Sequence, residues 1–114
     1  MTMMRQLTTR QEIDGVLAHE APAVIYKHST RCPVSLDAYN EMQRFVVAHP
    51  DVPVYLVDVV RDRPLSQYVA ERTRTVHQSP QAIVLLAGAP AWCGSHYSVT
   101  SHELAAQLAA LEGR

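Results

Sequence analysis

The side chain best suited to chemistry in this sequence is the thiol of Cys32, which is followed directly by Pro33. Proline is favoured at the first position of a helix, where its missing N–H would have no intrahelical partner. We therefore expect Cys32 at the start of a helix, where unpaired backbone N–H groups and the helix dipole favour negative charge. Because the thiolate is the nucleophilic form of cysteine, this position favours thiol–disulfide chemistry.

The spacing after Cys32 restricts that chemistry to one thiol. Dithiol oxidoreductases carry a second cysteine three residues later, whereas this chain has Ser35 there. A local disulfide is therefore impossible, and a covalent intermediate would be a mixed disulfide with an outside thiol, unless Cys93 can reach. Ser35 either donates a hydrogen bond to the Cys32 thiolate or is an ordinary serine that satisfies the helix start.

Three basic residues precede the cysteine and add positive charge near it in sequence: Lys27, His28 and Arg31. A lone cysteine has another common role, as a small buried apolar side chain. Position and flanking residues leave both interpretations of Cys32 open.

Apolar periodicity and turn residues predict four helices and four strands. Capping boxes at Thr9–Glu12 and Thr100–Glu103 begin the first and last helices. The first predicted helix covers 9–20, the second begins at 33 and runs up to 50, the third begins at 64 and the last begins at 100. The predicted strands cover 23–27, 54–60, 82–86 and 91–97.

The order of these elements predicts the topology. Two strand–helix–strand passages imply right-handed parallel crossovers, and the short turn at 88–90 implies an antiparallel hairpin. We therefore expect an α/β protein with a four-stranded mixed sheet and helices on both faces. This is the thioredoxin-like architecture, and the 114 residues are expected to form a single domain, 1–114.

Composition and charge limit the classes of partner that we expect for this chain. The formal net charge is -1 and the basic residues are scattered, so we expect no nucleic-acid partner. No apolar run is long enough to span a bilayer, so we expect no membrane partner. Two cysteines, no signal-peptide pattern and no metal-ligand spacing favour a cytoplasmic protein with reduced thiols and no metal.

Ser79-Pro80 precedes the third predicted strand. Proline cannot join a central ladder, so it belongs at the first residue of that strand. Thioredoxin-like proteins place a cis-proline at this point, facing the cysteine, which predicts a cis bond here; the alternative is an ordinary trans turn proline.

Three segments resemble a known family. Residues 28–35, HSTRCPVS, resemble the K-H-S-x-x-C-P-I-S segment of the YtxJ-like proteins, the monothiol bacilliredoxins. Residues 77–82, HQSPQA, are similar to the family's H-E-S-P-Q-A, and residues 92–100 to its W-x-x-S-H-W-x-I-T. The chain departs from the pattern at Arg31, Val34 and Tyr97.

The resemblance implies removal of bacillithiol, a low-molecular-weight thiol, from proteins with which it has formed mixed disulfides. Cys32 would be the catalytic nucleophile, bacillithiol a thiol co-substrate, and S-bacillithiolated proteins the partners of a monomer or weak dimer that needs no other cofactor. The residues expected to bind substrate are Thr30, Arg31, Pro33, Ser35, Ser79, Pro80 and His96.

Several side chains keep two interpretations. Cys93 is either a resolving thiol or, as we favour, a residue in the interior of the last strand away from Cys32. His96 either orients substrate or is a hydrogen-bonded structural residue. Trp92 and Tyr97 either rim the substrate site or, by default, pack in the core. Asp58 is either a proton-handling carboxylate or a charge at a strand end.

Two other functions compete with mixed-disulfide exchange. One is an iron–sulfur carrier like the monothiol glutaredoxins, whose Cys-Gly-Phe-Ser motif differs from Cys-Pro-Val-Ser here. The other is a non-catalytic binding module on a thioredoxin-like fold, in which Cys32 would react no faster than the cysteine of an unstructured peptide.

Overall fold

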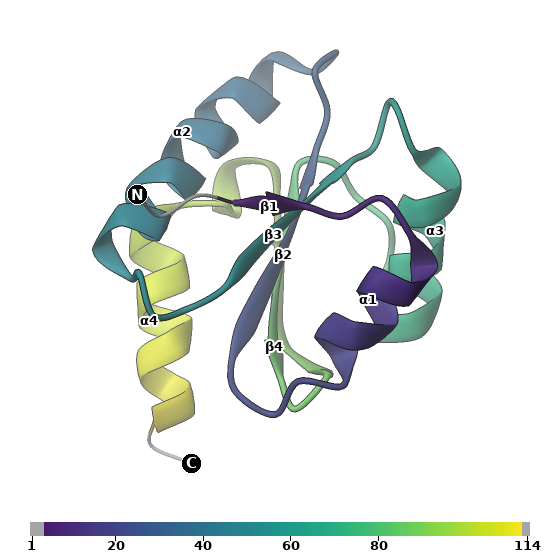
Figure 1. The fold of residues 1–114 in the computed structure, drawn as a ribbon. Helices are drawn as coiled ribbons and strands as arrows, with labels where there is room; N and C mark the ends of the chain where they lie inside the picture. Colours follow the sequence, from purple (N-terminus) through teal and green to yellow (C-terminus); the bar gives the residue numbers. More distant parts are fainter. Residues whose placement is uncertain (1–3, 113–114) are drawn as a thin grey trace.

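A computed structural model describes residues 4–112 of the chain, and a central sheet with helices on both faces organises them (Figure 1). The strands are β1 (Arg5–Gln6), β2 (Ala23–His28), β3 (Val54–Asp58), β4 (Gln81–Leu86) and β5 (Ala89–Ser95). The helices are α1 (Arg10–Leu17), α2 (Pro33–Ala48), α3 (Arg63–Thr73) and α4 (Ser101–Glu112), with a 3-10 turn η1 (His96–Ser98).

The sheet has five strands in the order β1-β3-β2-β4-β5, so the expectation of four was wrong. The additional strand, β1, is only two residues long and pairs in parallel with the outer edge of β3. Both of its residues are exposed and polar, so it has no apolar alternation to detect. The other four strands have the expected directions: β2 is parallel to β3 and antiparallel to β4, which is antiparallel to β5.

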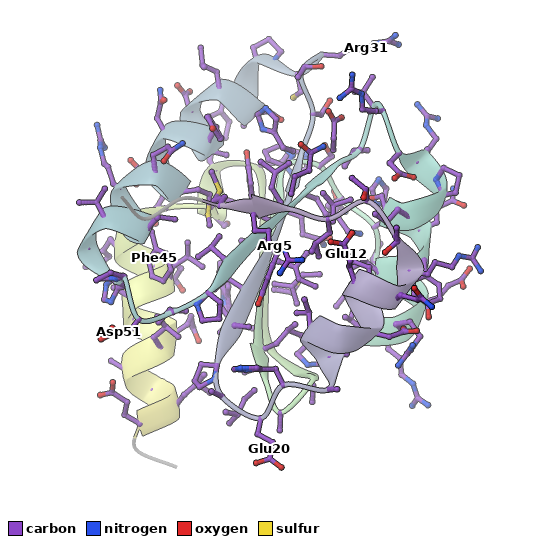
Figure 2. All side chains as sticks on the ribbon, viewed as in Figure 1. Arg5, Glu12, Glu20, Arg31, Phe45 and Asp51 are labelled. Carbon is purple, nitrogen blue, oxygen red and sulfur yellow. The ribbon has the colours of Figure 1, made fainter. Side chains whose placement is uncertain are left out.

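Successive residues of each central strand point to opposite faces of the sheet and build two separate cores. On one face, Val24 and Tyr26 of β2 pack with Phe45 of α2 and with Leu104 and Leu108 of α4. Figure 2 shows Phe45 directed inward from α2. The other face packs the apolar residues Ala23 and Ile25 of β2 against α1 and α3.

The hairpin between β4 and β5 turns one residue earlier than predicted. Leu86 pairs with Ala89, so the turn consists of Ala87 and Gly88, which have φ of 53° and 78°. Positive φ at both central residues is typical of the type I′ turn that joins twisted antiparallel strands. As a consequence β5 begins at Ala89 and ends at Ser95, and the strand predicted over 91–97 is shifted.

Helix starts follow the sequence closely. Thr9 accepts from the Glu12 N–H while the Glu12 carboxylate accepts from the Thr9 N–H, which completes the predicted capping box. At the last helix Thr100 Oγ1 accepts from the Glu103 N–H at 3.0 Å, whereas the Glu103 side chain accepts from Gln107.

None of the helices within residues 4–112 has both the length and the apolar character needed to cross a bilayer.

Candidate functional site

Cys32 lies where the loop after β2 enters α2, as the sequence predicts. It is the N-cap residue of α2, with extended φ and ψ of -107° and 122°, and Pro33 occupies the first helical turn. Its carbonyl oxygen accepts from the Ser35 N–H at 3.0 Å. The thiol is free and the residue is half-buried, so Cys32 stands at the positive end of a 16-residue helix with access to solvent.

A cavity of about 390 Å³ opens beside the thiol. It is lined by the loop and the first turn of α2: His28, Ser29, Thr30, Arg31, Cys32, Pro33 and Leu36. Thr30 and Arg31 are exposed, and Figure 2 shows the Arg31 side chain extending outward from this loop. The volume is within the usual range for small-molecule sites, so a low-molecular-weight thiol has room beside Cys32.

Ser35 lies one helical turn beyond Cys32 and is 1% exposed. Its hydroxyl oxygen is buried without a hydrogen-bond partner among the described residues. Buried hydroxyls are nearly always paired, so an unpaired one in the helix turn that follows a reactive group has a hydrogen bond to give. The first-turn serine therefore has its donor free when Cys32 is a thiol.

The segment with Pro80 lies at the same end of the sheet. Lys27 of β2 pairs with Gln81 of β4, so β4 begins beside the point where β2 runs into the Cys32 loop. The Ser79–Pro80 bond is cis, as predicted. Pro80 is buried, and its carbonyl oxygen accepts from the His96 N–H at 2.9 Å.

His28 ends β2 on the α2 face of the sheet and is half-buried. Its Nδ1 lies 2.9 Å from the hydroxyl of Tyr26, and its ring packs on Tyr39 of α2 at 5.1 Å between ring centroids. Burial lowers the pKa of His28, and the Asp58 carboxylate opposes that shift. This shift disfavours positive charge on His28, and the expectation that His28 adds charge near Cys32 stays a prediction.

Lys27 points to the other face and is completely buried. Its ammonium Nζ donates to His77 Nδ1 at 3.1 Å, and Ser66 Oγ of α3 lies 3.2 Å from the same nitrogen. Burial lowers the pKa of Lys27 to about 8. Lys27 therefore connects β2 to the segment that leads into Pro80. Because its side chain is buried on the other face of the sheet, the expectation of positive charge from Lys27 at Cys32 was wrong.

Similar solved structures share this fold. A chain described as a candidate oxidoreductase with a thioredoxin fold matches with a TM-score of 0.84 and 28% identity, over 92% of this chain and 93% of that one. Thioredoxin from Trypanosoma brucei brucei matches with a TM-score of 0.81 and 12% identity, over 99% and 94%. Thioredoxin from Malassezia sympodialis matches with a TM-score of 0.76 and 15% identity, over 96% and 90%.

The profile of the monothiol bacilliredoxin BrxC family matches residues 5–104. The chain belongs to this family. Family and fold together indicate thiol oxidoreductase activity. Two of the family's sequence segments are linked in this bacilliredoxin, because Lys27, which directly precedes the first segment, binds His77 at the start of the second.

The second cysteine of this bacilliredoxin lies on a different strand. Cys93 is in β5 opposite Ile83, and β4 separates it from the strand that leads to Cys32. Gln81 Nε2 lies 3.1 Å from its sulfur, and burial raises the pKa of the Cys93 thiol. This is the strand-interior location expected from the sequence; a resolving role for Cys93 is untested.

The described residues that line the cavity beside Cys32 do not include His96, Tyr97 or Trp92. His96 lies in η1 with φ of 55°, exposed, and is tied to Pro80 through its backbone. Tyr97 is 75% exposed, so the default of core packing was wrong for this residue, because η1 turns it outward after β5 ends. Trp92 packs partly buried against the core beneath α2 and α4.

Asp58 ends β3 beside His28, and its Oδ1 accepts from the N–H groups of Val60 and Arg61. Sequence reasoning missed Tyr26 and Tyr39 as neighbours of the site. Strand alternation was the available signal for Tyr26, because it places residues 26 and 28 on one face. Among residues 4–112, no three His, Cys, Asp or Glu side chains are grouped to hold a metal ion.

Proposed function

We propose that this bacilliredoxin removes bacillithiol, or a similar low-molecular-weight thiol, from protein mixed disulfides by monothiol exchange at Cys32. The observation that carries the proposal is Cys32 at the start of α2, beside an open cavity, with Ser35 one turn away. Ser35 stands where a dithiol enzyme has its second cysteine. The nucleophile and space for a small thiol are therefore present without a local resolving thiol.

The first step exchanges one disulfide for another. The Cys32 thiolate attacks the sulfur of the small thiol in the mixed disulfide, a bond forms between those sulfurs, and the substrate protein leaves as a thiolate that takes up a proton. The helix N-terminus and the Ser35 hydroxyl stabilise the attacking thiolate. The small thiol then remains on Cys32 within the cavity formed by the 28–33 loop and Leu36.

The second step restores the enzyme. A second low-molecular-weight thiol, as its thiolate, attacks the small-thiol sulfur, so that a symmetric disulfide leaves and Cys32 is again a thiolate. Electrons balance because the mixed disulfide of the protein is reduced to a thiol while the released small thiol and the incoming one are joined in a new disulfide.

The protein substrate would lie along the segment that leads into β4. Pro80 has no N–H to donate, so the backbone groups of Ser79 are the ones offered to an extended substrate chain. The Ser79 hydroxyl is buried without a partner among the described residues, like that of Ser35. Thr30, Arg31, Pro33 and His96 would form the rim, with the Arg31 guanidinium free to pair with a substrate carboxylate.

The test is a de-thiolation assay read by intact mass. A protein carrying one bacillithiol disulfide is incubated with the Cys93→Ser variant and with the same variant lacking Cys32 through Cys32→Ala. We expect loss of the bacillithiol mass only when Cys32 is present, with the adduct transferred to Cys32. A parallel substrate carrying glutathione measures preference for the small thiol. Retention of the modification to the same extent with and without Cys32 would refute the proposal.

We further propose that the protein works as a monomer or weak dimer. Because each cycle consumes a reduced thiol, we expect it to work where thiols are kept reduced, as in the cytoplasm. Monothiol exchange requires no metal or additional cofactor.

A further inference from the structure

We propose that His28 is the catalytic base and acid of the exchange: it accepts the proton of the Cys32 thiol and returns it to the departing thiolate. This inference rests on the proposed function. It begins from location, because His28 and Cys32 line the same cavity of about 390 Å³. A small thiol bound in this cavity would therefore have both residues in its walls.

The hydrogen bonds around His28 select its tautomer. The Tyr26 hydroxyl is 2.9 Å from His28 Nδ1 and 3.3 Å from the carbonyl oxygen of Ser35. A carbonyl can only accept, so the single hydroxyl hydrogen satisfies both contacts when it points to Ser35 and the tyrosine oxygen accepts from Nδ1–H. The proton of the neutral ring is then on Nδ1, and Nε2 carries the free lone pair that accepts a proton.

The ring is also fixed in place. Tyr26 is completely buried, and its ring centroid is 5.5 Å from that of His28. The ring of Tyr39 of α2 is tilted against the His28 ring, with 5.1 Å between centroids. Because Tyr26 also reaches the Ser35 carbonyl, the same hydroxyl connects the imidazole to the first turn of α2 that begins at Cys32. A base held this way keeps its geometry through both steps.

Charge around the imidazole suits both directions of proton transfer. The titratable groups around it are Tyr26 from its own strand, Tyr39 from α2 and Asp58 from β3. Cys32 and Arg31 line the same cavity, and the Arg31 side chain extends outward from it (Figure 2). Burial lowers the pKa of His28, which keeps the resting ring neutral and able to accept. The Asp58 carboxylate acts in the opposite direction and stabilises the imidazolium that forms.

The proton balance closes within one exchange. The Cys32 S–H proton moves to His28 Nε2, the thiolate forms the new sulfur–sulfur bond, and the imidazolium gives its proton to the leaving thiolate of the substrate protein. His28 is again neutral at the end, and no additional oxidant or reductant takes part.

The test measures Cys32 alone, without bacillithiol. Iodoacetamide alkylation is followed by mass against pH in a Cys93→Ser parent, in the parent with His28→Gln, and in the parent with His77→Gln as a matched control on the other face. We expect His28→Gln to lower the neutral-pH rate at least about tenfold and to recover parental rates at high pH, where the thiol ionises unaided. His77→Gln should follow the parent.

A second measurement keeps His28 intact, so it tests the inference even if His28→Gln folds poorly. The NMR titration of the His28 ring is compared between the Cys93→Ser parent and the same parent carrying Cys32→Ala. If the imidazole and the thiol share a proton their titrations are coupled, so we expect the His28 midpoint to move when Cys32 is removed. Unchanged alkylation in His28→Gln, or an unchanged His28 titration in Cys32→Ala, would overturn the inference while leaving de-thiolation by Cys32 intact. Failed de-thiolation with normal alkylation would instead reject the bacillithiol substrate.

Discussion

Two histidines, His28 and His77, lie at the same end of the sheet on opposite faces, and their surroundings differ in one decisive respect. His28 ends β2 beside α2, contacts the hydroxyl of Tyr26, and opens to the Cys32 cavity. His77 faces α3, where its Nδ1 is occupied by Lys27 Nζ and lies near Ser66. One imidazole is available to exchange protons with the thiol, and the other holds a buried ammonium in place.

The causes of their pKa shifts reflect this difference. Burial lowers the pKa of both rings. At His28 a carboxylate, Asp58, opposes the shift, whereas at His77 the cations Lys27 and Arg63 add to it. A proton that reaches His28 is therefore stabilised by a neighbouring negative charge, and one at His77 is repelled. In the proposed mechanism the two faces at the end of β2 therefore have different roles, proton transfer on the α2 face and structural support on the α3 face.

The largest expected effect concerns the α3 face, where Lys27 should control how stability depends on pH. Burial lowers the pKa of Lys27 to about 8 from 10.5, so between these values the unfolded chain binds more protons and stability rises with pH. The free energy of unfolding of wild type should rise by roughly 2–3 kcal/mol over this pH range, and that of Lys27→Met should lack this rise. Urea unfolding at several pH values between 8 and 10 measures it, with Ser66→Ala, which keeps both Lys27 and His77, as control. Equal slopes in wild type and Lys27→Met would contradict the supporting role of this face.

The next effect concerns reactivity on the α2 face. Ser35→Ala should slow Cys32 alkylation at neutral pH about tenfold and move its pH midpoint up by about one unit, because a hydrogen bond to a charged group is worth about 1.5–3 kcal/mol. Stability should change little, since the hydroxyl has no hydrogen-bond partner within residues 4–112. Alkylation and urea unfolding are measured together, with Ser66→Ala as the control serine from the other face. A midpoint unchanged in Ser35→Ala would show that the hydroxyl does not reach the thiolate.

The smallest effect isolates how the His28 ring is held. Tyr26→Phe keeps the buried ring and removes the hydroxyl that contacts His28 and the Ser35 carbonyl. We expect about a threefold loss in the de-thiolation rate, because a correctly oriented base contributes more than a free one. The matched variant is Tyr39→Phe, which keeps the stacked ring while losing only the contact with Gln43. If both variants lose the same activity, the Tyr26 hydroxyl has no special role in positioning His28.

Much of this architecture could be predicted from residue types alone. Helix starts carry local signals, so the capping box at Thr9 and the Cys32-Pro33 pair placed α1 and α2 correctly. The cis bond before Pro80 also followed from its place ahead of β4. β1 and the exact end of β5 were missed because a two-residue polar strand and a turn of Ala87-Gly88 have no periodicity of their own.

The sequence by itself determined the reactive part of the site: a cysteine at a helix start, a serine one turn later, and a proline before the neighbouring strand. These are local features, encoded within a few residues. Only the tertiary structure decided which face of β2 meets which helix, and so whether Lys27 or His28 shares the cavity with the thiol. Alternation places neighbouring residues on opposite faces, but the packing of α2 on one face and of α3 on the other gives each face its role.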